Sequence, residues 1–366
     1  MKHFDVNIIW LILTIIYLRK KYVVWLTFLM LDKYLTGIQI FINSNNQIID
    51  KSDFPRKNNI INNKILGPFI HCIFGKEILT NSNKTKAYLT ALEQTVPGST
   101  AIIAVSEFTV IDTNSFTNYN LIIHFERFGN LTINDVQQKY RFSQSVRFYY
   151  ASLRFSFYKK FFHSHPEYEY AMYSDEDSLI LKNPFELLEN STDEVHVMYD
   201  FLSYSHTGHP NFHWLRAWSR VSSSKKEKCG IDVLQVSLFD QSVKNRLPLN
   251  VGLMIGKTKY LIVICELISS IFECVGMFTN CAEQGLFNLL SISGQMDRRG
   301  IKLHPHTVQN GNLMSCPNYL TIDEFGRRIN SGEIFVLHHY HWVSNEYVNQ
   351  CNERVKTLIS YVELKH

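Results

Sequence analysis

Two aspartates separated by one residue, Asp175 and Asp177, are the side chains of this sequence best suited to chemistry. They follow a strand-like run over 168–173 and precede a short apolar run that Pro184 ends. Mg²⁺ and Mn²⁺ take one or two protein carboxylates and complete their coordination with substrate phosphates and water. The spacing therefore predicts a divalent-metal site for a substrate that carries a diphosphate. A solvated acidic turn between two strands is the alternative interpretation.

The segment from Tyr173 to Pro184 resembles the GT-A glycosyltransferases, especially the glycogenin-like enzymes of family 8. It has the same succession of an aromatic residue, Asp-x-Asp, a short apolar run and Lys-Asn-Pro, and the resemblance extends from about residue 65 to about residue 342. It implies a Mn²⁺ or Mg²⁺ ion and a nucleotide-sugar donor, most often a UDP-sugar. It also implies that Asp177 binds the metal directly and that Asp175 contacts the metal or the ribose.

A late histidine completes the metal site in the family 8 enzymes, and three histidines compete for that role here. They are His338, His339 and His341 in the segment 337–342. We favour His339 or His341, which would share one face of an extended segment. A separate zinc site or buried structural histidines are the alternatives. The Lys-Pro-Trp that follows the family histidine is missing, so its phosphate-binding lysine has no counterpart.

Residues 249–256 resemble the Asn-x-Gly strand of the same enzymes. By that resemblance Asn250 contacts sugar hydroxyls of the donor. Gly252 lets the backbone come close to the donor, since glycine has no side chain to obstruct it. The alternative is an ordinary buried strand with a turn glycine, which accounts for this sequence equally well.

The pair Glu283-Gln284 resembles the acidic residue and glutamine that lie near the sugar in the related enzymes. We predict that both are catalytic residues, and that Glu283 serves as a base if the reaction inverts. A helix start, where Glu favours the dipole, is the alternative. By the same resemblance Arg154, or else Arg147, faces the diphosphate, because an arginine fork suits phosphate oxygens. A solvent-facing arginine is the alternative.

Strand-like and helix-like segments alternate along the chain, which predicts an α/β fold with helices on both faces of a sheet. The resemblance implies a GT-A, Rossmann-like mixed sheet and a single catalytic domain over 65–345. Ligands in open α/β sheets bind beyond the carboxyl ends of strands, where the Asp-x-Asp would lie. The expected strands are 67–74, 100–105, 121–125, 168–173, 195–201 and 249–255, and the expected helices are 85–94, 142–162, 258–272 and 282–290.

The two ends of the chain have a different character. Residues 1–41 form a hydrophobic segment whose apolar runs, within 6–31, are split by Arg19-Lys20-Lys21. A signal anchor, an interfacial segment and a signal region all stay open. We expect membrane association through 6–31 and a type II protein of the Golgi or ER lumen, with a cytoplasmic protein as the alternative. Residues 42–64 are predicted to be an Asn-rich stem or linker, and 346–366 a C-terminal helix or tail.

Composition excludes several classes of protein. The chain has 366 residues, a formal net charge of +4, and no basic stripe with interleaved aromatic residues, which argues against nucleic-acid binding. Its seven cysteines form no Cys-x-x-Cys pair, so neither a zinc ribbon nor a thioredoxin site is supported.

The sequence thus predicts a metal-dependent glycosyltransferase that moves a hexose from a nucleotide diphosphate sugar to a glycan, protein or lipid acceptor. One alternative is a catalytically inactive GT-A-fold binding or scaffold protein, which the missing Lys-Pro-Trp favours. Another is a metal-dependent hydrolase built on the histidine cluster.

Overall fold

The computed structural model describes fifteen segments of the chain and divides it into two units, Met1–Arg56 and Lys57–His366. All described residues belong to the second unit: 60–61, 64–65, 67–73, 83–105, 111, 113–127, 146–189, 193–200, 204, 210–230, 241–275, 282–306, 313–314, 335–338 and 356–357. The predicted anchor (1–41) lies outside them, as do most of the stem and of the C-terminal tail. Within the described part, no helix has both the length and the apolar character needed to cross a membrane.

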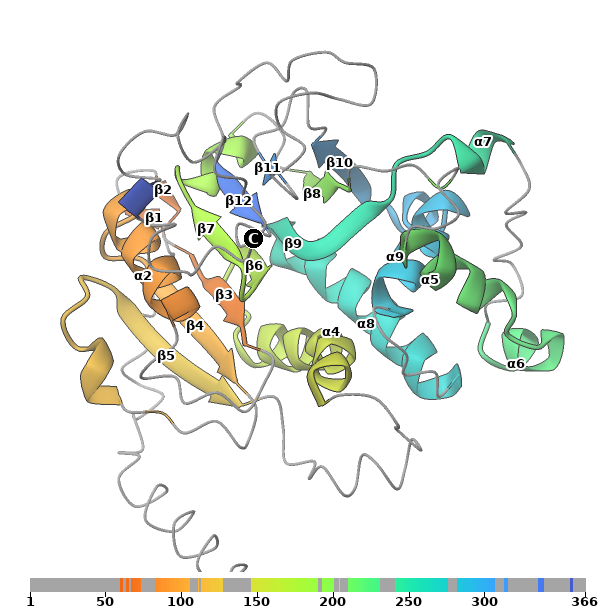
Figure 1. Cartoon of the computed structure of the whole chain (residues 1–366), viewed down its shortest axis with the longest axis horizontal. Helices are drawn as coiled ribbons and strands as arrows, with labels where there is room; N and C mark the ends of the chain where they lie inside the picture. The colour runs from red at the N-terminus through yellow and green to blue at the C-terminus, as the bar shows by residue number, and fades with distance from the viewer. Residues whose placement is uncertain are drawn as a thin grey trace, which may run out of the picture. The chain divides into compact units, whose positions relative to one another are not determined.

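A seven-stranded mixed sheet organises the second unit (Figure 1). β9 pairs antiparallel with both of its neighbours, whereas all other pairs in this sheet are parallel. In spatial order the strands are β10 (Lys302–His306), β8 (Glu194–Tyr199), β9 (Leu249–Lys257), β6 (Tyr170–Asp175), β3 (Phe69–Cys72), β4 (Thr100–Val105) and β5 (Ile122–Arg127).

The central strands are largely apolar because both faces of the sheet are covered. On one face, alternate strand residues such as Ile70 and Tyr173 pack with α4 (Val146–Ser164), α5 (Pro210–Ser219), α8 (Thr258–Val275) and α9 (Ala282–Ile292). On the other face, Phe69 and Met172 pack with α2 (Asn83–Thr95). A three-stranded sheet, β11 (Leu313–Met314), β12 (Val336–His338) and β7 (Ser178–Ile180), joins the second layer. The predicted α/β fold with helices on both faces is therefore confirmed.

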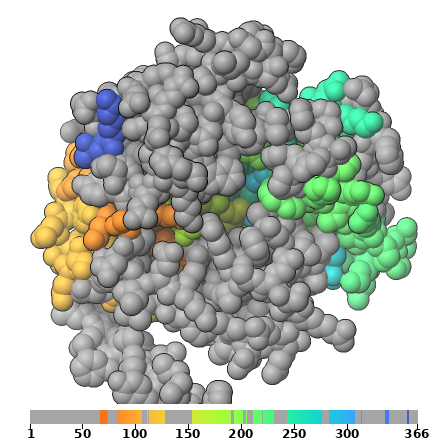
Figure 2. Space-filling model, viewed as in Figure 1, coloured from red at the N-terminus to blue at the C-terminus, as the bar shows by residue number. Residues whose placement is uncertain are grey.

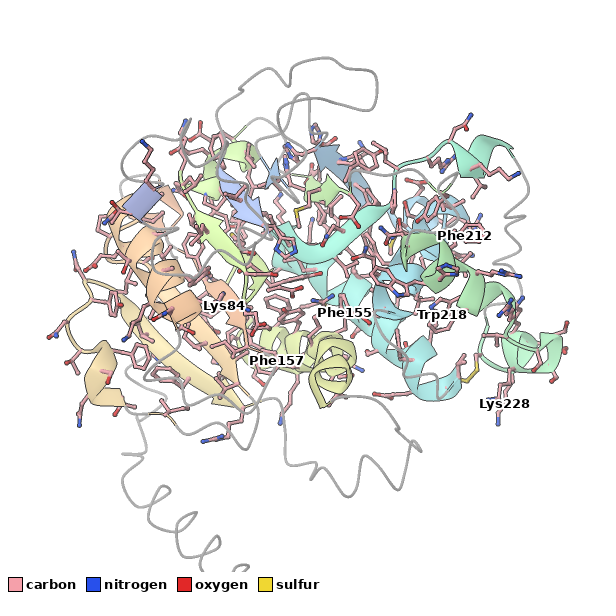
Figure 3. All side chains as sticks on the ribbon, in the orientation of Figure 1. Lys84, Phe155, Phe157, Phe212, Trp218 and Lys228 are labelled. Atoms are coloured by element: carbon pink, nitrogen blue, oxygen red, sulfur yellow. A yellow bond between two sulfur atoms is a disulfide. The ribbon has the colours of Figure 1, made fainter. Side chains whose placement is uncertain are left out.

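Large aromatic side chains fill the layer of helices on the first face. Phe155 of α4 and Trp218 of α5 are fully buried there (Figure 3). Trp218 meets Phe272 of α8 edge to face, with ring centroids 5.3 Å apart. α8 is amphipathic, and its buried residues recur every three or four positions as a surface helix requires.

A disulfide joins Cys229, which follows α6 (Ser223–Lys228), to Cys274 of α8. It is the yellow bond close to Lys228 in Figure 3. The space-filling view shows residues around β5 at one side of the near surface and residues around α5 and α6 at the other (Figure 2).

The remaining elements are short: β1 (Ile60–Ile61), β2 (Lys64–Ile65), α7 (Gln241–Lys244), η3 (Thr113–Phe116), η4 (Pro184–Leu188) and η5 (Asp297–Arg299). Asn183 caps η4 by accepting a hydrogen bond from the Phe185 amide, and Pro184 begins the helix. This is the physical reason that the chain turns after the apolar run following Asp177.

The predicted elements correspond to observed ones, with shifts of a few residues at their ends. β4 has the predicted bounds, and β6 extends two residues beyond the prediction, to Asp175. Part of the predicted helix 142–162 lies outside the described residues, which resume with α4 at Val146. β6 ends at the carboxyl edge of the parallel strands, and the antiparallel β9 begins at that same edge.

Candidate functional site

Asp175 and Asp177 lie where the chain passes from the large sheet to the small one. β6 ends with Asp175, a two-residue turn contains Asp177, and β7 begins at Ser178. β7 pairs antiparallel with β12, with Ser178 opposite His338. Asp175, Asp177 and His338 each offer one ligand atom, and these atoms lie within 4.8 Å of one another. Two carboxylates and one imidazole are a donor set that a divalent cation can use.

His338 is thus the histidine that the described structure brings to the two aspartates. The predicted ligands His339 and His341 lie outside the described residues, so that prediction stays untested. The His338 ring is fully buried, and its Nδ1 lies 2.9 Å from the Ser178 hydroxyl and 3.5 Å from Asp177 Oδ1. These two contacts fix the orientation of the ring toward the aspartates.

Gly252 has no side chain, which leaves room for the side chains of Asp175 and His338 to lie close together. β9 pairs with β6 so that Leu253 lies opposite Ser174, which brings Gly252 beside Asp175. A Cβ atom at Gly252 would come within 2.5 Å of His338 Nε2 and 2.8 Å of Asp175 Oδ2. A side chain of any size there would collide with both groups, so the glycine keeps a cradle between them. The residues present therefore fit a bound divalent cation.

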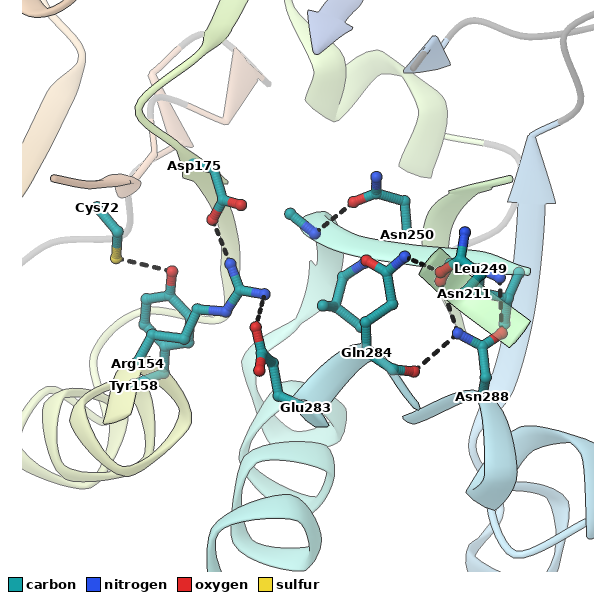
Figure 4. Close-up of polar contacts among 12 residues, drawn as sticks. Cys72, Arg154, Tyr158, Asp175, Asn211, Leu249, Asn250, Glu283, Gln284 and Asn288 are labelled. Atoms are coloured by element: carbon teal, nitrogen blue, oxygen red, sulfur yellow. Dashed lines mark hydrogen bonds and ion pairs between the residues drawn. The ribbon is translucent and has the colours of Figure 1, made fainter. Parts of the chain in front are cut away.

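Arg154 of α4 reaches the same site from below the sheet (Figure 4). Its Nη1 forms an ion pair with Asp175 Oδ1, and its Nη2 lies 3.4 Å from Glu283 Oε1. Burial alone would lower the pKa of Arg154, but Asp175 and Glu283, with smaller contributions from Tyr158 and Tyr173, raise that pKa. The guanidinium is thus a fixed positive charge within the protein. The side chain of Arg147, the other candidate, lies outside those that the structure describes.

A buried network of amides and one carboxylate lies beside the aspartates, where β8 ends and β9 begins (Figure 4). Asp200 accepts hydrogen bonds from Asn250 (3.0 Å), Gln284 (2.9 Å) and Asn211 (2.7 Å). Asn250 also accepts from the Gly252 amide at 2.7 Å. Asn288 holds both the amide and the carbonyl of Leu249. The network fixes the backbone that carries Gly252.

The side chains predicted to be catalytic, Glu283 and Gln284, are both buried and both engaged by the chain's own groups. Asp200 and Asn211 were not predicted to belong to the site. A signal for Asp200 existed, since it is a carboxylate near the carboxyl end of the expected strand 195–201, but no motif distinguished it. Nothing in the local sequence indicated Asn211.

Two buried residues, His71 and Cys72, belong to β3, which pairs with β6 beside Asp175. Burial lowers the pKa of His71 to about 3, and its ring stacks on Tyr88 with centroids 3.8 Å apart. The Cys72 thiol lies 2.8 Å from the Tyr158 hydroxyl, and burial raises the pKa of that thiol. Both residues are therefore uncharged at neutral pH and add no charge to the carboxylates and Arg154.

No family model matches the chain, and no curated protein matches it either. Among solved structures it is similar to mouse xyloside xylosyltransferase 1 in its apo form, with 12% identity, a TM-score of 0.42, and coverage of 74% of this chain and 97% of that one. It is also similar to the galactosyltransferase LgtC in complex with donor and acceptor sugar analogs, with 12% identity, a TM-score of 0.41, and coverage of 82% and 97%.

Proposed function

We propose that this chain is a metal-dependent glycosyltransferase that transfers a sugar, a hexose by the family resemblance, from a nucleotide diphosphate sugar. The observation that carries the proposal is the gathering of Asp175, Asp177 and His338 around Gly252 at the carboxyl edge of the parallel strands. Open α/β sheets bind ligands at that edge. A scaffold protein has no need of two carboxylates and an imidazole that converge on one point, which argues against the inactive alternative.

Asp175, Asp177 and His338 would hold Mn²⁺ or Mg²⁺. When bound, such an ion neutralises the charge that develops on a diphosphate as it leaves. The carboxylates favour a hard cation, and the single imidazole favours Mn²⁺ over Mg²⁺. The side-chain positions are set by the β6–β7 turn and by the pairing of β7 with β12, so the donor set is organised before the substrate arrives.

Arg154 would have two roles in the proposed enzyme. It offsets part of the charge that Asp175 and Glu283 would otherwise place in a buried site, and it supplies donors beside the expected position of the diphosphate. Glu283, which Arg154 holds, would orient the guanidinium. This role suits its burial better than that of a base, which must reach a substrate proton.

Asn250, Gln284 and Asp200 would form the wall that the donor sugar meets. Asn250 and Gln284 are fixed by Asp200, so their polar atoms keep one arrangement. Fixed amides of this kind discriminate between sugars, because a substrate that lacks the matching hydroxyl leaves buried polar groups unpaired. We assign these residues to donor recognition. The acceptor would bind on the side of the donor sugar that faces away from them.

We further propose that the second unit works in an oxidising compartment, in agreement with the expected lumenal location. Disulfides form and persist in such compartments, and Cys229 is joined to Cys274. Protease protection of the full chain in sealed microsomes tests this. Digestion without detergent would contradict a lumenal location.

The experiment that tests the function measures the melting temperature of the full chain with a panel of nucleoside diphosphates, with and without Mn²⁺. Stabilisation by one nucleotide that requires Mn²⁺ is the expected result, and the Asp175→Asn/Asp177→Asn variant should lose it. Asp297→Asn, which changes an exposed carboxylate elsewhere, is the matched control. No shift with any nucleotide in a folded protein would overturn the donor site and favour the scaffold.

A further inference from the structure

A second group of metal-ligating side chains lies on β8 and β10, the two strands at one edge of the large sheet (Figure 1). His196 belongs to β8, and His304 and His306 belong to β10. The strands pair in parallel with His304 opposite His196. Residues two apart on a strand point to the same face, so all three rings meet on one face. One nitrogen of each ring lies within 4.8 Å of the others.

The three rings form a nearly equilateral cluster. Their centroids are 4.9, 5.1 and 5.0 Å apart for His196–His304, His196–His306 and His304–His306. His196 and His306 are buried, whereas the His304 side chain is 48% exposed, so solvent and ions reach the cluster from its side. Three imidazoles at one point, open on one side, are a common donor set for a transition metal.

Glu194 orients the exposed member of the cluster. Its Oε2 lies 2.9 Å from Nδ1 of His304, which directs the other ring nitrogen away from the carboxylate. A carboxylate that accepts a hydrogen bond from one nitrogen of a histidine, while the second nitrogen binds the ion, is a recurrent arrangement around metals. Glu194, two residues before His196 on β8, thus gives His304 the hydrogen bond that a metal-binding histidine usually has.

An ion could bind only if the hydrogen bond between His196 and His306 opened. Nδ1 of His196 lies 2.8 Å from Nε2 of His306, so one of the two nitrogens donates a proton to the lone pair of the other. Tetrahedral Zn²⁺ with Zn–N bonds of 2.0–2.1 Å sets its nitrogens about 3.3 Å apart. Opening the contact by about 0.5 Å and moving the shared proton to the far nitrogen of its ring would free both lone pairs.

We propose that His196, His304 and His306 form a zinc site that fastens the edge strand β10 to β8. Imidazole ligands select Zn²⁺ over Mg²⁺ and Mn²⁺, so this site differs in chemistry from the carboxylate-rich site at Asp175 and Asp177. Among the described strands, β10 pairs only with β8, and it contains Pro305, so a bound ion would stabilise it more than it would an inner strand. A cluster of structural histidines that binds no ion is the alternative.

The test uses the full chain with the Asp175→Asn/Asp177→Asn substitutions, so that binding at the other site does not contribute. The protein is stripped with a chelator and titrated with Zn²⁺ by calorimetry and with Co²⁺ by visible absorption. We expect one equivalent of Zn²⁺, a tetrahedral Co²⁺ spectrum, and a higher melting temperature with Zn²⁺. Adding His304→Gln should weaken Zn²⁺ binding by about 100-fold or more, and adding Glu194→Gln by about 10-fold.

His213→Gln is the matched control, because His213 is exposed on α5 and should leave Zn²⁺ binding unchanged. Melting in chelator verifies that each variant is folded, and Glu194→Gln carries the test if His304→Gln is not. Failure of the double-Asn protein to bind Zn²⁺ would overturn the proposal, as would binding that neither the His304 nor the Glu194 substitution weakens. Neither result bears on the glycosyltransferase proposal, which rests on other residues.

Discussion

Substituting alanine for Gly252 should disable the site without unfolding the chain. The new Cβ atom would come within 2.5 Å of His338 Nε2, 2.7 Å of His338 Cε1 and 2.8 Å of Asp175 Oδ2. All three are side-chain atoms, so the backbone of β9 has no reason to move. To restore ordinary contact distances of about 3.5 Å, the ring and the carboxylate must each retreat by about 1 Å.

A retreat of that size is large for a metal site, where ligand distances hold to within about 0.2 Å. A misplacement of about 1 Å costs on the order of 100-fold in a positioned site, which corresponds to about 2.7 kcal/mol. We therefore expect Gly252→Ala to weaken Mn²⁺ binding by about 100-fold in a calorimetric titration. The melting temperature measured in chelator should change little.

Gly256→Ala is the matched control on the same strand. Its Cβ atom would meet the Glu194 carbonyl oxygen at 3.2 Å and atoms of Val195, far from the aspartates, so Mn²⁺ affinity should stay the same. Because the clash at Gly252 involves the His338 ring, any small loss of stability in Gly252→Ala should shrink further when His338→Ala is also present. Unchanged Mn²⁺ affinity in Gly252→Ala would refute the reasoning.

Three further results are expected. Arg154→Met should lower the free energy of unfolding at neutral pH by about 3–5 kcal/mol in urea denaturation, because the buried Glu283 carboxylate loses its arginine; a loss below about 1 kcal/mol would contradict this. The folded pKa of His71, about 3, lies below its unfolded value of about 6.5, so the unfolded chain takes up the proton first and stability falls as pH drops from about 6.5 toward 3, by up to about 1.4 kcal/mol per pH unit. His71→Phe should flatten that slope, and an unchanged slope would refute the assignment. Replacing Cys229 and Cys274 by serine opens a loop with a sequence separation of 45 residues and should cost about 4 kcal/mol in the same denaturation assay; equal stability would argue against the pairing.

The local elements could be predicted because their causes are local. β4 was predicted with its observed bounds, since a run of apolar residues buried on both faces is visible in the sequence. The end of the apolar run that follows Asp177 could be predicted in the same way, from Pro184. The antiparallel direction of β9 could not be predicted, because a buried strand has the same apolar composition whether it runs parallel or antiparallel to its neighbours.

The choice of histidine shows where prediction from the sequence ends. His338 meets Asp177 because β12 pairs with β7, a contact between segments 160 residues apart. An extended segment alone favoured His339 and His341, which lie outside the described residues, and the contact of His338 with Asp177 could not be predicted without knowledge of the partner strand. The network around Asp200 also joins four separate segments, so no spacing within one segment could reveal it.

The most direct measurement of the central claim is release of nucleoside diphosphate from a panel of nucleotide sugars by the full chain, with and without Mn²⁺. Water can replace an unknown acceptor in the proposed transfer, so the assay requires no knowledge of the acceptor. We predict that one donor is consumed, that Mn²⁺ is required, and that Asp175→Asn/Asp177→Asn abolishes the reaction while Asp297→Asn does not. A folded chain that binds Mn²⁺ and consumes none of the donors, or one whose activity survives the loss of both aspartates, would contradict the account.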